Sequence, residues 1–270
     1  MVLSVAAVRG AVGFLTRIPV GHDEAAWDAW VAAPAAMVPV GYLVGAVLSL
    51  PFVVGGFLAL PSPVVAFAAL GTLIVVTGIT HLDGVADCAD AAIVHGTHVE
   101  RREVLKDTVT GVGALAGVGL VLVGLGLGFL AVAGLPLFAG VAVVLASEVG
   151  AKAAMAIVAA TETAPHEGFG SALTEGTGRS TQVAAVALSL PVLGVGGLQQ
   201  FVAVGPSPGD GTDSLISAAV CLLAALGVAL LARRWARTRL GGVNGDVFGA
   251  TNELARIAGL HLGVVAWTLW

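Results

Sequence analysis

The sequence has few charged residues and almost no cysteine. Only 11% of its 270 residues are Asp, Glu, Lys or Arg, whereas soluble globular domains have about 25%. Its two cysteines, Cys88 and Cys221, form no Cys-x-x-Cys pair, which argues against a zinc site and a disulfide framework. The net charge of -5 excludes the basic surface of a nucleic-acid-binding protein. The N-terminus lacks a short apolar run with a small-residue cleavage site, so we predict no signal peptide.

What the sequence has instead is apolar surface. Hydrophobic residues make up 57% of the chain, and the mean hydropathy is +0.99. A bilayer span needs about 20 apolar residues. Seven stretches qualify: Ala35–Leu60, Pro63–Thr80, Val109–Ala133, Leu135–Ala160, Thr181–Val204, Ser214–Ala232 and Leu254–Trp270. We therefore expect a single all-α domain, a polytopic integral membrane bundle of about seven transmembrane helices (34–270), preceded by an interfacial segment with an amphipathic helix (1–33).

The basic residues lie on one side of these predicted spans. Eleven of the 12 fall in the N-terminus or in and around the loops that follow even-numbered spans, Arg256 among them at the start of the last span, and only Lys152 lies in the middle of a span. The positive-inside rule then places the N-terminus and the three polar loops in the cytoplasm. We expect a multi-pass protein of the cell membrane. Glu148 lies four residues before Lys152 in one predicted span, which predicts a structural ion pair between them.

A first polar segment follows the second predicted span. If this span continues as a helix, Asp83, Asp87 and Asp90 share one face, because they are spaced four and three residues apart. Three anions on one face repel each other unless cations lie between them, and carboxylate oxygens suit Mg²⁺ or Mn²⁺. An acidic solvated loop is the alternative, but the membrane boundary makes charge costly and favours a metal site. His81, taken alone, is more typical of a structural hydrogen-bonding residue.

A second polar segment ends at the start of the third predicted span. It contains Lys106, Asp107 and Thr108, followed by Gly111. A glycine-rich helix start with a nearby lysine can hold a phosphate through backbone N–H groups and a point charge. Arg101 and Arg102 precede them and form a basic pair, for which an ordinary membrane anchor remains the alternative role.

Two further polar segments come later in the chain. Residues 161–180 contain His166 and predict a substrate contact or a flexible lid. The last span begins with Asp246 and Glu253, which are seven residues apart and hence on one helix face, with Asn252 beside them. A purely structural loop does not explain these three polar residues entering an apolar span.

Six carboxylates in these segments lie at one predicted membrane depth. They are Asp83, Asp87, Asp90, Asp107, Asp246 and Glu253. Two divalent metal ions held by such a set would neutralise a pyrophosphate and stabilise the attacking and leaving oxygens of an in-line phosphoryl transfer. The residues alone therefore predict a metal-dependent transferase that acts at the cytoplasmic membrane face.

Four motifs in this order resemble the cobalamin synthase family, the adenosylcobinamide-GDP ribazoletransferases. They are Phe14–Pro19, His81–Asp90, Lys106–Thr108 with Gly111, and Gly241–Ala250. The chain departs from the family pattern at Ala91, where glycine is usual, and at Asn244, where threonine is usual. It also departs around His166 and at Arg256.

The resemblance implies the last step of cobalamin nucleotide-loop assembly. The 5′-oxygen of α-ribazole, or of its 5′-phosphate, would attack the cobinamide-side phosphorus of adenosylcobinamide-GDP, and GMP would leave. Mg²⁺ is the expected metal, held by the six carboxylates above. Either a carboxylate or His81 would take the proton of the attacking hydroxyl. Asp83, Asp87 and Asp246 would also have catalytic roles. The expected substrate contacts are Lys106, Thr108, Gly111, His166, Asn244 and Asn252.

Two other functions compete with this one. CDP-alcohol phosphotransferases carry a similar Asp-x-x-Asp segment. In those enzymes the motif continues to an Ala-Arg pair, and this pair is missing after Asp90 here. An ion-coupled transporter would place its polar groups near the middle of the bilayer, whereas here they gather at one boundary. The expected partners are the lipid bilayer and the two substrates, with no nucleic acid. The oligomeric state is left open, a homo-oligomer included.

Overall fold

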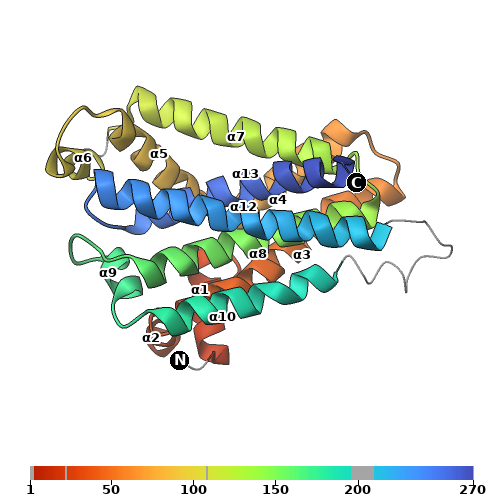
Figure 1. Ribbon diagram of the computed structural model, residues 1–270. Coiled ribbons are helices and arrows are strands. Elements are labelled where there is room, and N and C mark those ends of the chain that lie inside the picture. The colour runs from red at the N-terminus through yellow and green to blue at the C-terminus, as the bar shows by residue number, and fades with distance from the viewer. Residues whose placement is uncertain (1–2, 22, 108, 196–209, 270) are drawn as a thin grey trace.

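The computed structural model describes residues 3–21, 23–107, 109–195 and 210–269, and every regular element in these ranges is helical. Long helices lie side by side, as Figure 1 shows. The elements are α1 (Val5–Leu15), α2 (Glu24–Val31), η1 (Pro34–Ala36), α3 (Met37–Phe57), α4 (Ser62–Thr77), α5 (Thr80–Ile93), α6 (His98–Val104), α7 (Val112–Val132), α8 (Leu137–Thr161), α9 (Phe169–Thr174), α10 (Arg179–Ser189), η2 (Leu190–Gly194), α12 (Asp210–Arg239) and α13 (Gly245–Leu269).

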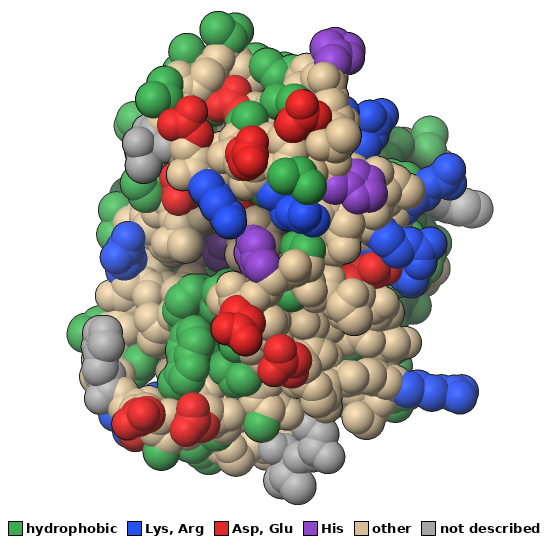
Figure 2. Space-filling view, turned by 90° about the vertical axis from the view of Figure 1, so that its left-hand side faces the viewer, with side chains coloured by type: hydrophobic (Ala, Val, Ile, Leu, Met, Phe, Trp, Pro, Cys, Tyr) green, Lys and Arg blue, Asp and Glu red, His purple; other side chains and the backbone are tan. Residues whose placement is uncertain are grey.

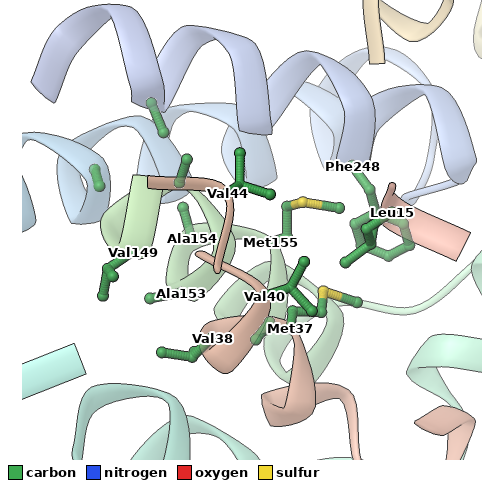
Figure 3. Packing of buried hydrophobic residues seen from close by; sticks show 14 of the residues in the cluster. Leu15, Met37, Val38, Val40, Val44, Val149, Ala153, Ala154, Met155 and Phe248 are labelled. Carbon is green, nitrogen blue, oxygen red and sulfur yellow. The ribbon is translucent and has the colours of Figure 1, made fainter. Parts of the chain in front are cut away.

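Helix α8 lies at the centre of the bundle and packs against α3, α12 and α13. Small residues allow this close packing, as is typical of helices in lipid. A Cβ at Gly41 of α3 would lie 2.8 Å from Val149 Cα of α8, and one at Gly150 of α8 would lie 2.9 Å from Ala225 Cβ of α12. Figure 3 shows the apolar side chains of α3 and α8, including Val44 and Met155, meeting in this core.

The prediction of an all-α membrane bundle is confirmed, but the count of seven spans is not. Within the described ranges, four helices are long and apolar enough to cross a membrane, namely Pro34–Phe57, α7, α8 and Gly211–Arg239. The bent pair α4 and α5 becomes a fifth only if its halves are taken as one span. The predicted second span is short because α4 ends at Thr77. The predicted fifth span runs into residues outside the described ranges. The last helix begins at Gly245, earlier than predicted, and its first turns carry charged residues.

The bend between α4 and α5 directs the first polar segment back into the bundle. The two helices meet at 94°. Gly78 lies at the break with φ of +70°, a conformation that favours glycine. The Arg17 N–H donates to the Val76 carbonyl at 2.7 Å, and a Cβ at Gly78 would lie 2.4 Å from the Arg17 guanidinium. The N-terminal segment, which we predicted as interfacial, therefore packs against this bend.

Two arginines hold the loops at the same end of the bundle. The buried Arg101 of α6 donates to the carbonyls of Ala91 and Ala92 at 2.8 and 3.3 Å, which caps the C-terminus of α5. Arg102 donates to the Leu240 carbonyl at 2.8 Å, after the end of α12. These contacts position α5 and the turn before α13 relative to each other. Arg101 and Arg102, for which we left a membrane-anchoring role open, thus bind backbone carbonyls at two helix ends.

Candidate active site

Helices α5 and α13 approach each other through two glycines. A Cβ at Gly84 of α5 would lie 2.6 Å from the Asp246 carbonyl oxygen, and one at Gly249 of α13 would lie 3.1 Å from His81 Cα. Such backbone contact brings the acidic residues of α5 beside the first turn of α13. The predicted helix over Asp83, Asp87 and Asp90 is confirmed, because α5 contains all three, but this helix follows a bend and does not continue the span before it.

Three carboxylates of these two helices lie near each other, and few hydrogen-bond donors and no ion-pair partner offset their negative charge within the described residues. Asp87 is repelled by Asp246 and Asp83, and also by Asp90, whose own carboxylate is hydrogen-bonded to α7. Asp83 is exposed, and Asp87 and Asp246 are half-buried. Among the described residues, neither Asp83 nor Asp87 has a hydrogen-bond or ion-pair partner, and Asp246 Oδ2 accepts one bond from Asn244 Nδ2 at 2.7 Å. We call Asp83, Asp87 and Asp246 the acidic cluster.

The acidic cluster has the donor atoms that a divalent cation prefers, but not a preformed cage. In the part of the chain that the structure describes, no group of three or more His, Cys, Asp or Glu side chains is placed to hold a metal ion. Mg²⁺ is commonly bound by one or two carboxylates together with substrate phosphates and waters. The cluster fits that mode of binding better than an all-protein site.

Asp90 lies close enough to Asp87 to repel it, but its carboxylate is hydrogen-bonded to the start of α7. Its carboxylate accepts hydrogen bonds from the backbone N–H of Gly111 at 2.7 Å and of Ala114 at 2.9 Å. A carboxylate at a helix N-terminus is stabilised by the free N–H groups there. A Cβ at Gly111 would lie 2.4 Å from Asp90 Oδ1, so glycine is needed for the contact. These bonds join α5 to α7 through Asp90, which we predicted as a metal ligand, and Gly111, which we predicted to contact substrate.

The rest of the second polar segment lies in the connection between α6 and α7. Lys106 and Asp107 are exposed, and Asp107 Oδ1 accepts from the Val109 N–H at 3.1 Å. No described contact joins Asp107 to the acidic cluster. Thr108 lies outside the described residues.

Glu253 and Asn252 belong to a buried polar network deeper in the bundle. Arg256 donates to both Glu253 and Glu148, and Lys152 Nζ donates to Asn252 Oδ1 at 2.5 Å. The predicted direct pair of Glu148 with Lys152 is therefore wrong, since both residues find partners on α13 instead. Glu253, predicted as a metal ligand, is 2% exposed and Asn252, predicted to contact substrate, is 0% exposed.

The network continues to His81 at the start of α5. Asn252 Nδ2 lies 3.2 Å from His81 Nδ1 and 3.1 Å from Glu253 Oε1. His81 is 6% exposed, and it lies two residues before Asp83. The polar network and the acidic cluster are thus successive parts of the same pair of helices.

The third polar segment packs on the turn that precedes α13. The Val243 N–H donates to the Thr163 carbonyl at 3.0 Å, and a Cβ at Gly170 would lie 2.8 Å from Asn244 Cα. The exposed His166 is close enough to Asp246 for electrostatic attraction. Figure 2 looks onto this end of the molecule and shows acidic, basic and histidine side chains around a central hollow.

Comparisons with known proteins identify the family. A family model described as Cobalamin-5-phosphate synthase matches residues 7–264. The chain belongs to the cobalamin-5-phosphate synthase family.

Relatives named adenosylcobinamide-GDP ribazoletransferase match almost the whole chain. That of Halorubrum lacusprofundi is 47% identical over 270 residues, covering 97% of this chain and 98% of the relative. That of Haloquadratum walsbyi is 42% identical, covering 98% and 99%. That of Methanocella arvoryzae is 32% identical, covering 97% and 96%. No solved structure matches the chain. The resemblance drawn from the four motifs is confirmed.

An aromatic cluster supports the site of this cobalamin-5-phosphate synthase family member, and we did not predict it. Phe169 of α9 stacks on Phe14 of α1 with ring centroids 4.6 Å apart, and it meets Phe248 of α13 edge-on at 6.1 Å. Trp27 and Trp30 of α2 complete the cluster. It joins the N-terminal helices to the third polar segment and to α13. Single aromatic residues spread over the sequence give no local periodicity, so only the presence of Phe14 in a family motif pointed here.

Proposed function

We propose that this chain is an adenosylcobinamide-GDP ribazoletransferase that completes the nucleotide loop of cobalamin. It transfers the adenosylcobinamide-phosphate group to α-ribazole or to its 5′-phosphate. A ribose hydroxyl that is free in both acceptors forms a bond to the cobinamide-side phosphorus, rather than the 5′-oxygen that we expected, because the 5′-oxygen is already esterified in the 5′-phosphate. The bond from that phosphorus to the bridging oxygen breaks, and GMP leaves with that oxygen. The hydroxyl proton passes to a base. Family membership and the names of relatives that cover the whole chain support this reaction.

The structural observation that carries the proposal is the backbone contact of Gly84 with Asp246. It supports a common site for carboxylates of the first and fourth polar segments, although Asp83 and Asp246 are 163 positions apart in the sequence. Uncompensated carboxylates repel a pyrophosphate, so an anionic substrate requires a cation at this place. We propose that Asp83, Asp87 and Asp246 bind Mg²⁺, which when bound would neutralise the phosphates.

The remaining residues of the site position the substrate and the carboxylates. Asn244 holds Asp246 through its side-chain amide and accepts the Val247 N–H at 3.1 Å, so it caps α13. The exposed side chains of Lys106 and His166 would contact the substrate phosphates or the ribazole. We further propose that this end of the bundle faces the cytoplasm, because the Lys and Arg residues of the polar loops gather there.

A transfer assay tests the proposed function directly. The purified full-length chain in detergent is given adenosylcobinamide-GDP, α-ribazole and Mg²⁺, and the release of GMP is followed together with the corrinoid product. We expect GMP and product in equal amounts, and their loss with EDTA. A reaction with no more GMP than a heat-inactivated sample gives would refute the assignment. α-Ribazole 5′-phosphate, offered in parallel, shows which acceptor is preferred.

A further inference from the structure

Lys152 is a fully buried cation with one hydrogen-bond partner. It is 0% exposed in the middle of α8, and its Nζ lies 2.5 Å from the side-chain Oδ1 of Asn252. A lysine ammonium group has three donors and no acceptor. The atom that faces it must therefore be the amide oxygen, and this fixes which way the Asn252 amide points.

The charge balance of the network requires this ammonium form. Four charged groups lie together with at most 2% exposure, the carboxylates of Glu148 and Glu253 and the cations of Arg256 and Lys152. With Lys152 protonated their charges sum to zero, and with Lys152 neutral they leave one uncompensated anion in an apolar bundle. Burying an unpaired charge is costly. The protonated lysine is therefore the form that the surroundings stabilise.

The orientation of the Asn252 amide determines the state of His81. With Oδ1 bound to Lys152, the two N–H groups on Nδ2 face His81 Nδ1 at 3.2 Å and Glu253 Oε1 at 3.1 Å. A donor that faces Nδ1 needs a lone pair there. Glu253 Oε1 lies 3.6 Å from the same nitrogen, which is too long for a hydrogen bond from an Nδ1–H group. The ring proton of His81 must therefore be on Nε2.

The Nε2–H group of His81 is free to donate to a bound molecule. No described residue is hydrogen-bonded to it. The fully enclosed side-chain atoms without a partner in the described ranges are Trp30 Nε1, Ser214 Oγ and Ser217 Oγ. Since His81 Nε2 is not one of them, it retains accessible surface although the residue is only 6% exposed. Such a donor beside the acidic cluster suits an anionic oxygen.

We propose that Lys152, acting through Asn252, fixes His81 as the neutral Nε2–H tautomer and so makes it a hydrogen-bond donor to a phosphate oxygen of the substrate. The identity of that substrate rests on the proposed function, whereas the tautomer does not. Lys152 and Asn252 are then positioning residues. His81 is excluded as the base that takes the proton of the attacking hydroxyl, and this proton goes to a carboxylate.

Nitrogen NMR on the full-length protein in detergent, with ¹⁵N-labelled histidine, tests the tautomer. The chain has six histidines, and the signals of His81 are those lost in His81→Gln. In the wild type we expect Nδ1 without a proton and Nε2 with one. In Asn252→Asp the carboxylate only accepts, so Nδ1 becomes protonated. A wild-type His81 with a proton on Nδ1 would overturn the proposal.

Two other histidines serve as internal references in the same spectra. His261 Nε2 lies 2.9 Å from the Gly124 carbonyl oxygen, and His98 Nε2 lies 3.0 Å from that of Thr238. Carbonyls only accept, so both residues carry a proton on Nε2, and Asn252→Asp leaves them unchanged. Lys152→Met frees the amide to rotate, and a fraction of His81 then has its proton on Nδ1. Ser147→Ala, a buried change elsewhere on α8, is the matched control. In this variant we expect no His81 with its proton on Nδ1. An unchanged His81 in Lys152→Met would refute the role of the lysine.

The donor role is tested by activity in two variants. The amide nitrogen of glutamine donates close to where Nε2 of histidine does but cannot act as a base. We expect His81→Gln to stay within about tenfold of the wild-type rate, and His81→Leu to lose about a hundredfold or more, as for other single donors to a transition state. Equal inactivity of the two folded variants would overturn the donor role. If the wild type itself releases no GMP, the proposed function fails, and the NMR result still decides the tautomer.

Discussion

Gly84→Ala tests whether the close approach of α5 and α13 places the acidic cluster. An added Cβ would lie 2.6 Å from the Asp246 carbonyl oxygen, whereas ordinary contact begins at 3.4 Å. Helix α13 must therefore retreat by about 0.8 Å. Overpacking of this kind costs about 1–3 kcal/mol, and replacing glycine by alanine inside a helix returns about 1 kcal/mol. The variant should thus fold with a net loss of stability of about 0–2 kcal/mol.

The effect on activity should be much larger than the effect on stability. A displacement of about 1 Å between reacting groups can cost about a hundredfold in rate. We therefore expect Gly84→Ala to release GMP about a hundred times more slowly while its thermal unfolding in detergent stays near that of the wild type.

Two other helical glycines provide the matched controls for Gly84→Ala. Gly71 in α4 and Gly119 in α7 have no other atom within 4 Å of an added Cβ. Their alanine variants should keep wild-type activity and equal or higher stability. A Gly84→Ala variant with the wild-type rate would refute the reasoning that this contact positions the carboxylates.

Three further predictions follow from the same contacts. Asp83→Asn and Asp246→Asn should each lose at least a hundredfold in GMP release and unfold at or above the wild-type temperature, because each removes one of three repelling charges; normal rates would contradict their role. Arg256→Met should lower the free energy of unfolding by about 3–5 kcal/mol, because it removes the ion-pair partner of Glu148 and Glu253 and leaves Lys152 as one buried cation for two carboxylates; an unchanged unfolding curve in detergent would refute this. Removal of divalent ions with EDTA should abolish activity, Mg²⁺ or Mn²⁺ should restore it, and full activity after chelation would exclude the metal.

The sequence predicted the helices well because their signals are local. The spacing of Asp83 and Asp87 indicated a helix, and the structure has one. The apolar run before them continued without interruption, so the bend of 94° was not foreseen. This bend depends on the positive φ of Gly78 and on the contact of Gly78 with Arg17, which lies 61 residues earlier in the sequence. One glycine among 38 gives no sign of its conformation in the sequence alone.

The partners of the charged residues were harder to predict than their places on helices. Glu148 and Lys152 have the spacing of an ion pair, yet each bonds to α13, a hundred or more residues away. Local spacing describes one helix, whereas burial makes every charged group seek its best partner across helices. For Asp90 a signal did exist. Gly111 and Gly113 start α7 without a side-chain cap, and a carboxylate from another helix supplies it.

The site is marked by neighbouring acids, of which Asp83 and Asp87 have no hydrogen-bond or ion-pair partner among the described residues. Asp90 is bound by two backbone N–H groups, and Glu148 and Glu253 share Arg256. The fold therefore provides partners for these three acids. Asp83 and Asp87, beside Asp246, receive no such partner although they repel each other. Because this repulsion lowers stability and a nearby lysine or arginine would remove it, we infer that the acidic cluster is retained for a cation that arrives with the substrate.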